Sequence, residues 1–288
     1  MPLRREPKAP SSVTEVVPPA SSPTLLLRVR WVVPGPDDAP TVLAFTGFGH
    51  RLDPWQRLRA PGWRVGVLEF PVGSPPTEVW TPEGLAEQLP RFWGRAARRV
   101  LMSFSFGAAG ATSVGRVLAR TARAPDATGL LLPHRAIHVA PVQWARIPWS
   151  ILRRIPASAR LPALKRLAKG GGALMALAGK TGDYGMREFV QLVDRHVGWD
   201  FVAFYLPYLD WIDPVRKTLA TWSANPWPTH LIGATRDRVI PSKPMRGQVS
   251  SFAGVAYDEF DAAHFNAVDA ARTEIFRLLA LERKLVRA

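Results

Sequence analysis

One short segment places a serine where nucleophilic chemistry would need it. Residues 100–108 are Val-Leu-Met-Ser-Phe-Ser-Phe-Gly-Ala, so Ser105 stands two residues after Ser103 and two before Gly107. Apolar residues precede it and small residues follow it, which predicts a strand that turns sharply into a helix. Such a turn exposes the serine hydroxyl at the end of a sheet. Its usual motif is Gly-x-Ser-x-Gly, and here Ser103 stands in place of the first glycine. The alternative is a serine that merely caps the helix.

A serine hydroxyl becomes a strong nucleophile only when a base accepts its proton and a carboxylate orients that base. Among the six histidines, His264 is preferred, because it follows the last predicted strand and precedes the last predicted helix. Asp237 is the preferred carboxylate, on the loop after the preceding strand. Asp258 and Asp261 are alternatives, since both lie closer to His264 in sequence. Asp237 would otherwise be a surface carboxylate paired with an adjacent arginine, and His264 a loop histidine without a partner.

The order of these three residues resembles that of the α/β-hydrolase family, in which serine, acid and histidine each follow a strand. The segment 233–241, Gly-Ala-Thr-Arg-Asp-Arg-Val-Ile-Pro, is similar to the family's acid loop, whose aspartate is followed by x-x-Val/Ile-Pro. Asp261-Ala-Ala-His264 is similar to its Gly-x-x-His loop, with Asp261 in place of glycine. The resemblance implies that Ser105, Asp237 and His264 form a catalytic triad.

The same resemblance implies an oxyanion hole, in which backbone amides stabilise the negative charge that develops on the substrate. One amide is expected from Phe106, directly after Ser105. The loop 45–50, Phe-Thr-Gly-Phe-Gly-His, is similar to the family's His-Gly-x-Gly turn with Thr46 in place of histidine. That match implies that Phe48 supplies the second amide. The alternative for this loop is an ordinary glycine-rich turn.

These residues need a sheet that brings their loops to one edge, and the rest of the chain predicts one. Short apolar strands alternate with helices, which predicts an α/β fold with a mainly parallel central sheet flanked by helices. Residues 24–142 and 226–288 are expected to form this α/β-hydrolase core. Residues 143–225 interrupt the alternation and predict a helical cap, or alternatively a long helical excursion within the core. Residues 1–23, rich in Pro and Ser, predict a disordered leader.

The individual elements follow from local patterns. Thr81 is expected to be the N-cap of the helix over 83–97, with Pro82 in its first turn. Strands are expected over 25–31, 41–45, 63–70, 100–103, 136–140, 230–233 and 254–260. Helices are expected over 54–58, 83–97 and 108–123, and from about residue 268 onward.

Two groups of side chains in the predicted cap bear on the substrate. An aromatic group that includes Trp199, Phe204 and Tyr208 is a candidate lining for an apolar acyl pocket, whereas such groups more often form the core of the cap itself. Residues 146–180 carry eight basic residues and no acidic one, interleaved with apolar residues. This pattern favours a helix with a solvated basic face. The alternative is weak contact with an anionic membrane surface or with an acidic ligand.

Composition excludes several classes of function. The 288 residues carry a formal net charge of +15, from 38 Lys and Arg against 23 Asp and Glu, yet no nucleic-acid-binding motif is present, so no nucleic-acid partner is predicted. There is no cysteine, no metal-binding histidine motif and no complete phosphate-binding loop, so neither metal nor cofactor is expected. No apolar run approaches the roughly 20 residues that span a bilayer. A secretory signal is also absent, which predicts a cytoplasmic location.

Taken together, the motifs predict a serine hydrolase that cleaves a carboxylic ester with an apolar acyl group through an acyl-enzyme. An acyl thioesterase with the same triad is one alternative. The other is a non-catalytic α/β-hydrolase-like protein that binds a ligand or partner, which the departures at Ser103 and Asp261 favour. A small-molecule ester or thioester is the expected partner, and the sequence predicts no oligomeric state.

Overall fold

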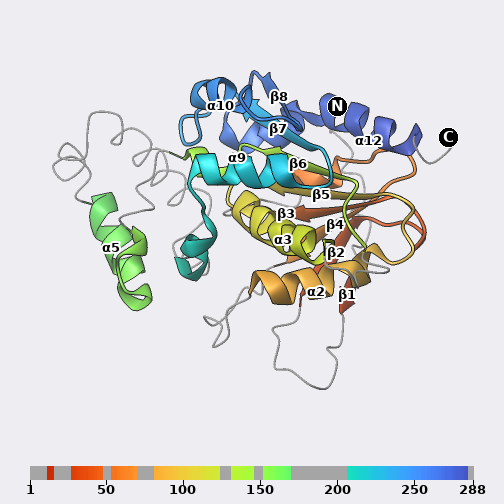
Figure 1. Ribbon diagram of the computed structural model, residues 1–288, viewed down its shortest axis with the longest axis horizontal. Helices are drawn as coiled ribbons and strands as arrows, with labels where there is room; N and C mark the ends of the chain where they lie inside the picture. Colours follow the sequence, from red (N-terminus) through yellow and green to blue (C-terminus); the bar gives the residue numbers. More distant parts are fainter. Residues whose placement is uncertain are drawn as a thin grey trace, which may run out of the picture.

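The computed structural model describes residues 12–15, 27–47, 53–69, 81–123, 131–145, 152–169 and 206–284. Its strands form one eight-stranded sheet in the order β1-β2-β4-β3-β5-β6-β7-β8 (Figure 1). Every neighbouring pair from β4 to β8 is parallel, and β1 and β2 add two antiparallel strands at one edge. The strands are β1 Ser12–Glu15, β2 Arg28–Val33, β3 Thr41–Phe45, β4 Arg64–Glu69, β5 Arg99–Phe104, β6 Arg135–Val139, β7 Thr229–Ala234 and β8 Val255–Phe260.

Helices flank this sheet, which confirms the predicted fold class. Figure 1 shows α2, α3 and α9 side by side along the sheet, and α3 contacts both of its neighbours. The described α-helices are α1 Asp53–Gln56, α2 Pro82–Trp93, α3 Gly107–Thr121, α5 Ala157–Lys169, α9 Val215–Ala224, α10 Ser242–Val249, α11 Ala267–Ala270 and α12 Arg272–Lys284. The described 3-10 helices are η1 Val142–Trp144, η3 Leu206–Trp211 and η4 His264–Asn266.

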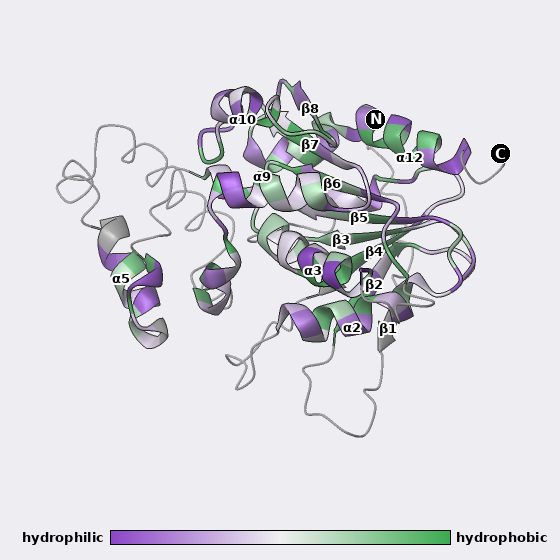
Figure 2. Cartoon of the chain, viewed as in Figure 1, coloured by the Kyte–Doolittle hydropathy of each residue, from purple (hydrophilic) through white to green (hydrophobic). Residues whose placement is uncertain are grey.

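The hydrophobic core lies on the central strands. Every residue of β3 and of β7 is buried, as expected for parallel strands that are covered on both faces. Figure 2 shows the most hydrophobic colours along the strands at the centre of the sheet. The strand β8, at the other edge, is mostly half-buried. None of the described helices is long and apolar enough to cross a membrane.

The start of α2 agrees with its predicted N-cap, and its end does not. The hydroxyl of Thr81 accepts a hydrogen bond from the amide of Gly84 at 3.0 Å, and Pro82 is the first helical residue. The helix ends at Trp93 rather than at residue 97. Gly94 follows with a φ of 51°, a left-handed conformation that glycine adopts without strain and that stops the helix.

One strand and one α-helix lie where neither was predicted. Ser12–Glu15, within the predicted leader, forms the edge strand β1 and pairs antiparallel with β2, so the prediction of disorder does not hold for these four residues. The run is too short to show a periodic pattern, although Val13 and Thr14 favour extended backbone. The other residues of 1–23 lie outside the described ones. The helix α10 was not predicted, because Pro244 and Gly247 within it are residues more typical of a loop.

The segment predicted as a cap is described only in part. The helix α5, the short η3 and the helix α9 belong to it, whereas 146–151 and 170–205 lie outside the described residues. The helix α9 packs against α3 and β8, with Leu219 and Trp222 buried, so it belongs to a layer over the sheet. The cap domain stays a prediction.

Candidate active site

Ser105 occupies the sharp turn between β5 and α3. Its φ is 52°, a left-handed conformation that costs a residue with a side chain roughly 1–3 kcal/mol. The end of β6 holds this turn in place. The amide of Ser105 donates to the carbonyl of Val139 at 3.0 Å, and the amide of Val142 donates to the carbonyl of Ser105 at 3.1 Å. The two backbone groups of the serine are therefore tied to the end of β6 and to η1, which follows it.

Close backbone contacts explain the small residues around Ser105. A Cβ on Gly107 would lie 2.3 Å from the carbonyl oxygen of Phe45, so only glycine fits where α3 begins beside the end of β3. A Cβ on Gly47 would lie 2.6 Å from the Cβ of Ser105. The predicted oxyanion loop therefore starts directly against the serine.

The structure brings Ser105, His264 and Asp237 into one hydrogen-bonded chain. The Nε2 atom of His264 lies 3.0 Å from Oγ of Ser105, and its Nδ1 atom lies 2.5 Å from Oδ2 of Asp237. All three residues are buried. His264 is the first residue of η4, after β8, and Asp237 lies on the loop after β7, so the parallel strands deliver all three side chains to one edge of the sheet.

The carboxylate of Asp237 is fully engaged. Its Oδ1 atom accepts hydrogen bonds from the amides of Val239 at 2.9 Å and Ile240 at 2.8 Å, and its Oδ2 atom faces the imidazole. The loop thus wraps its own backbone around the acid, which satisfies a charge that would otherwise be costly to bury. Aromatic rings hold the imidazole on its other sides: the centroid of Phe104 is 4.9 Å away and that of Phe265 is 5.6 Å away.

The alternative carboxylates have other partners. Asp258 accepts a hydrogen bond from Nε2 of His230 at 2.7 Å. Asp261 pairs with Nε of Arg236 at 2.7 Å and is largely exposed. Arg236 is thus bound to Asp261 rather than to Asp237, so its pairing with Asp237, considered from the sequence, is not observed.

Comparison with known proteins finds matches to the fold of this chain but none to its sequence. No protein-family model matches the sequence, and a search of curated proteins finds no match either. Solved structures do match. An esterase from Thermogutta terrifontis has a TM-score of 0.59 at 15% identity, with 96% of this chain and 100% of that chain covered. An epoxide hydrolase of the α/β-hydrolase superfamily, from metagenomes of hot environments, has a TM-score of 0.55 at 18% identity, with 94% and 98% covered. The chain has the α/β-hydrolase fold.

A third match extends this fold comparison to thioesters. The thioesterase domain from the curacin biosynthetic pathway has a TM-score of 0.52 at 12% identity, with 94% of this chain and 100% of that chain covered. Proteins of this α/β-hydrolase fold thus act on several kinds of electrophile, and the fold by itself does not choose between them.

The other predicted site residues fall into two groups. Phe106, the residue after the serine, is buried and is the N-cap of α3, so the first amides of that helix start at the turn. Tyr208 in η3 is only 1% exposed and packs edge-on against Trp211, with ring centroids 4.8 Å apart, so in this structure it is part of the hydrophobic core. Its role in substrate binding stays a prediction. Phe48, Trp199 and Phe204 lie outside the described residues.

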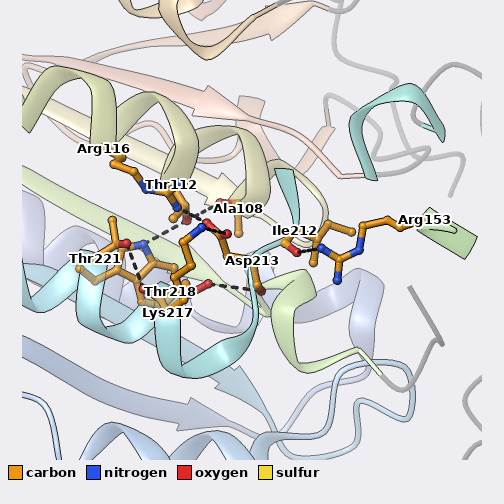
Figure 3. A network of polar contacts seen from close by, with 10 residues as sticks. Ala108, Thr112, Arg116, Arg153, Ile212, Asp213, Lys217, Thr218 and Thr221 are labelled. Atoms are coloured by element: carbon orange, nitrogen blue, oxygen red, sulfur yellow. Dashed lines mark hydrogen bonds and ion pairs between the residues drawn. The ribbon is translucent and has the colours of Figure 1, made fainter. Parts of the chain in front are cut away.

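Polar contacts fasten the described part of the predicted cap to the α/β-hydrolase core, as Figure 3 shows. The carboxylate of Asp213, which follows η3, pairs with Arg116 of α3 and, at 2.8 Å, with Lys217 of α9. Arg153 donates to the carbonyl of Ile212 at 3.0 Å. The buried Arg160 donates to three backbone carbonyls, those of Arg153, Ile155 and Leu206. Two of the predicted basic residues therefore hold the segment together.

One group among the described residues has side chains that suit a metal ion. Ligand atoms of His230, Asp258 and Glu274 all lie within 4.8 Å of one another, on β7, β8 and α12. Burial lowers the pKa of His230, which favours the neutral imidazole that a metal needs. Arg277 competes for Glu274, to which its Nε donates at 2.7 Å. No short motif reveals this group, because its members are far apart in sequence.

Proposed function

We propose that the protein is a serine hydrolase that cleaves a carboxylic ester with an apolar acyl group. The supporting observation is the continuous chain of hydrogen bonds from Ser105 through His264 to Asp237. Solved esterases share the fold around it, which makes an ester the first substrate class to test. A small-molecule ester is the expected binding partner. The cytoplasmic location stays a prediction.

The proposed reaction begins when Oγ of Ser105 attacks the ester carbonyl and Nε2 of His264 takes the hydroxyl proton. Asp237 keeps the Nδ1 proton of the imidazole in place and stabilises the positive charge that forms. The amide of Phe106, with that of Phe48, holds the oxyanion. His264 then protonates the leaving alcohol, the acyl group stays on Ser105, and a water molecule activated by the same imidazole releases the acid.

The two departures from the family pattern are compatible with this chemistry. The side chain of Ser103 is accommodated, because its hydroxyl lies 2.7 Å from Nδ1 of His138. Asp261 projects to the surface, where its side chain is bound to Arg236. Both departures, which favoured a non-catalytic protein on sequence grounds, therefore leave the three-residue chain intact.

An acyl thioesterase is the second candidate, because the same attack cleaves a thioester and the curacin thioesterase domain shares the fold. Electrostatic help from the basic segment would then come from Arg154 and Arg166, which are exposed, rather than from Arg160, which is buried among carbonyls. Among the described residues of this segment, the same two exposed side chains would also serve in weak contact with an anionic membrane surface.

Hydrolysis of p-nitrophenyl butyrate tests the proposal. Ser105→Ala should lower kcat by at least about 10³-fold, because the nucleophile is lost. Ser113→Ala is the matched control, a buried serine on α3, and should keep kcat within about twofold. Circular dichroism confirms that both variants fold. Full activity in Ser105→Ala would overturn the proposal. A parallel assay with butyryl-coenzyme A separates ester from thioester preference.

A further inference from the structure

A second serine–histidine contact lies inside the sheet, next to the turn that carries Ser105. Ser103 on β5 and His138 on β6 are direct neighbours in the parallel register. Their side chains meet with Oγ and Nδ1 2.7 Å apart, and both residues are fully buried, with 0% and 1% of their surface exposed. The reaction proposed above uses neither of them.

His138 does not act as an acid or a base at this place. Burial lowers its pKa to about 3, so the ring is neutral at physiological pH. It stacks on Trp222 of α9, with ring centroids 4.4 Å apart and an interplanar angle of 14°. A neutral imidazole, fixed by stacking and bonded to a hydroxyl, is suited to hold a position rather than to move a proton.

The contacts of Trp222 lead back to the turn. Its indole Nε1 donates to the hydroxyl of Thr112 at 3.0 Å, and that hydroxyl donates to the carbonyl of Ala108 at 2.6 Å, a contact that Figure 3 includes. Ala108 is in the first turn of α3. The His138 ring therefore connects the residue two before Ser105 with the helix that starts two residues after it.

The strained turn needs such a connection. Ser105 has a positive φ, and so does Ala140, its neighbour at the end of β6. Residues in this conformation persist only where the surroundings hold them. Backbone hydrogen bonds with Val139 and Val142 tie Ser105 itself to the end of β6 and to η1, which follows it. The Ser103–His138 contact joins β5 to β6 directly before this turn, and of these three contacts it is the one made by side chains.

We propose that His138 is a positioning residue, which acts through Ser103 to hold the turn so that Oγ of Ser105 faces Nε2 of His264. This inference rests on the proposed function, since it concerns the geometry of the same nucleophile. It also gives a reason for serine at position 103: glycine would fit the turn, whereas serine adds a hydrogen bond to the adjacent strand.

A double-mutant cycle tests the contact. Ser103→Ala and His138→Phe each remove the hydrogen bond, and phenylalanine keeps a flat ring against Trp222. Each should lower kcat for p-nitrophenyl butyrate about tenfold with little change in KM, because about 1.4 kcal/mol of positioning is lost. The double variant should lose no more than either single variant, since both remove one interaction. The rate of labelling by a fluorophosphonate should fall in parallel.

A matched control separates positioning from stability. His230→Gln removes another buried histidine, which is bonded to Asp258 and is remote in sequence from the turn. It should lower the melting temperature and leave kcat of the folded enzyme unchanged. If His138→Phe fails to fold, Ser103→Ala and Ser103→Gly still report, because both residues are small enough for the turn.

The outcomes distinguish this inference from the function on which it rests. Wild-type protein that neither hydrolyses esters nor reacts with the fluorophosphonate would overturn the proposed function. An active wild type whose Ser103 and His138 variants lose only stability, with kcat and labelling rate unchanged, would overturn the positioning role alone. So would fully additive losses in the double variant.

Discussion

Two histidine–aspartate pairs in this protein look alike in composition and differ in what surrounds them. In His264–Asp237 the bonded atoms are 2.5 Å apart, and in His230–Asp258 they are 2.7 Å apart. The Asp237 side chain is 0% exposed and receives two amides on its second oxygen, whereas that of Asp258 is 44% exposed. The free side of the His264 ring faces a serine hydroxyl.

The proposed function assigns catalysis to only one of these two pairs, so a hydrogen-bonded pair does not by itself make a reactive site. A buried, fully bonded carboxylate fixes the orientation of its imidazole, and reactivity depends on what the second ring nitrogen meets. For His264 that is Ser105, on a strained turn at the carboxyl edge of the sheet. His230 lies within β7 and uses its Nε2 atom for Asp258. Its surroundings suit packing or a metal ion rather than nucleophilic attack.

The largest expected difference between the two pairs is in catalysis. Asp237→Asn should lower kcat about 10⁴-fold, because an amide at this position stabilises the wrong tautomer of the imidazole. Asp258→Asn makes the same chemical change in the other pair and should leave kcat within about twofold. Steady-state kinetics on p-nitrophenyl butyrate measures both. Equal losses in the two variants would remove the distinction between the pairs.

An effect of intermediate size is expected on stability, when a glycine beside Ser105 and a glycine near the other pair are each replaced by alanine. Gly107→Ala, two residues after Ser105, places a Cβ 2.3 Å from a backbone oxygen and should destabilise the protein by about 3 kcal/mol. Gly247→Ala, in α10 beside β7 and β8, meets nothing within 4 Å and should stabilise it by about 0.5–1 kcal/mol. Urea unfolding gives both free energies. A tolerated Gly107→Ala would show that the turn is not held as tightly as these contacts require.

The smallest effect is on the pH dependence of stability. Burial lowers the pKa of His230 in the folded state, so between that value and about 6.5 the unfolded chain binds a proton that the folded one does not. The free energy of unfolding should therefore rise with pH in this window. His230→Gln removes this contribution and should flatten the curve below about pH 6.5. An unchanged slope would mean that His230 titrates normally.

The part of the fold that positions Ser105, Asp237 and His264 was predictable because each element has a local pattern. The strand–turn–helix around Ser105 and the loops after β7 and β8 are short segments, and parallel strands necessarily bring their ends to one edge. Their catalytic role stays a proposal. The pattern also supported Thr81 as an N-cap, which the hydrogen bond from Gly84 confirms.

Other features depend on contacts that no local pattern carries. Ser103 meets His138, 35 residues later, only because β5 and β6 pair in one particular register. The amides of Val239 and Ile240 reach Asp237 through the backbone, so their residue types give no signal. The early end of α2 depends on the conformation of Gly94. The strand β1 forms because it pairs with the edge of β2, and its four residues alone do not predict that pairing.

The most direct test is to find which atom reacts with a fluorophosphonate. If His264 and Asp237 activate the serine, intact-protein mass spectrometry should show one adduct, and peptide mapping should place it on Ser105. His264→Gln should slow the reaction by at least about 10³-fold while the protein stays folded. No adduct on the folded wild type, or an adduct on another serine, would contradict the account.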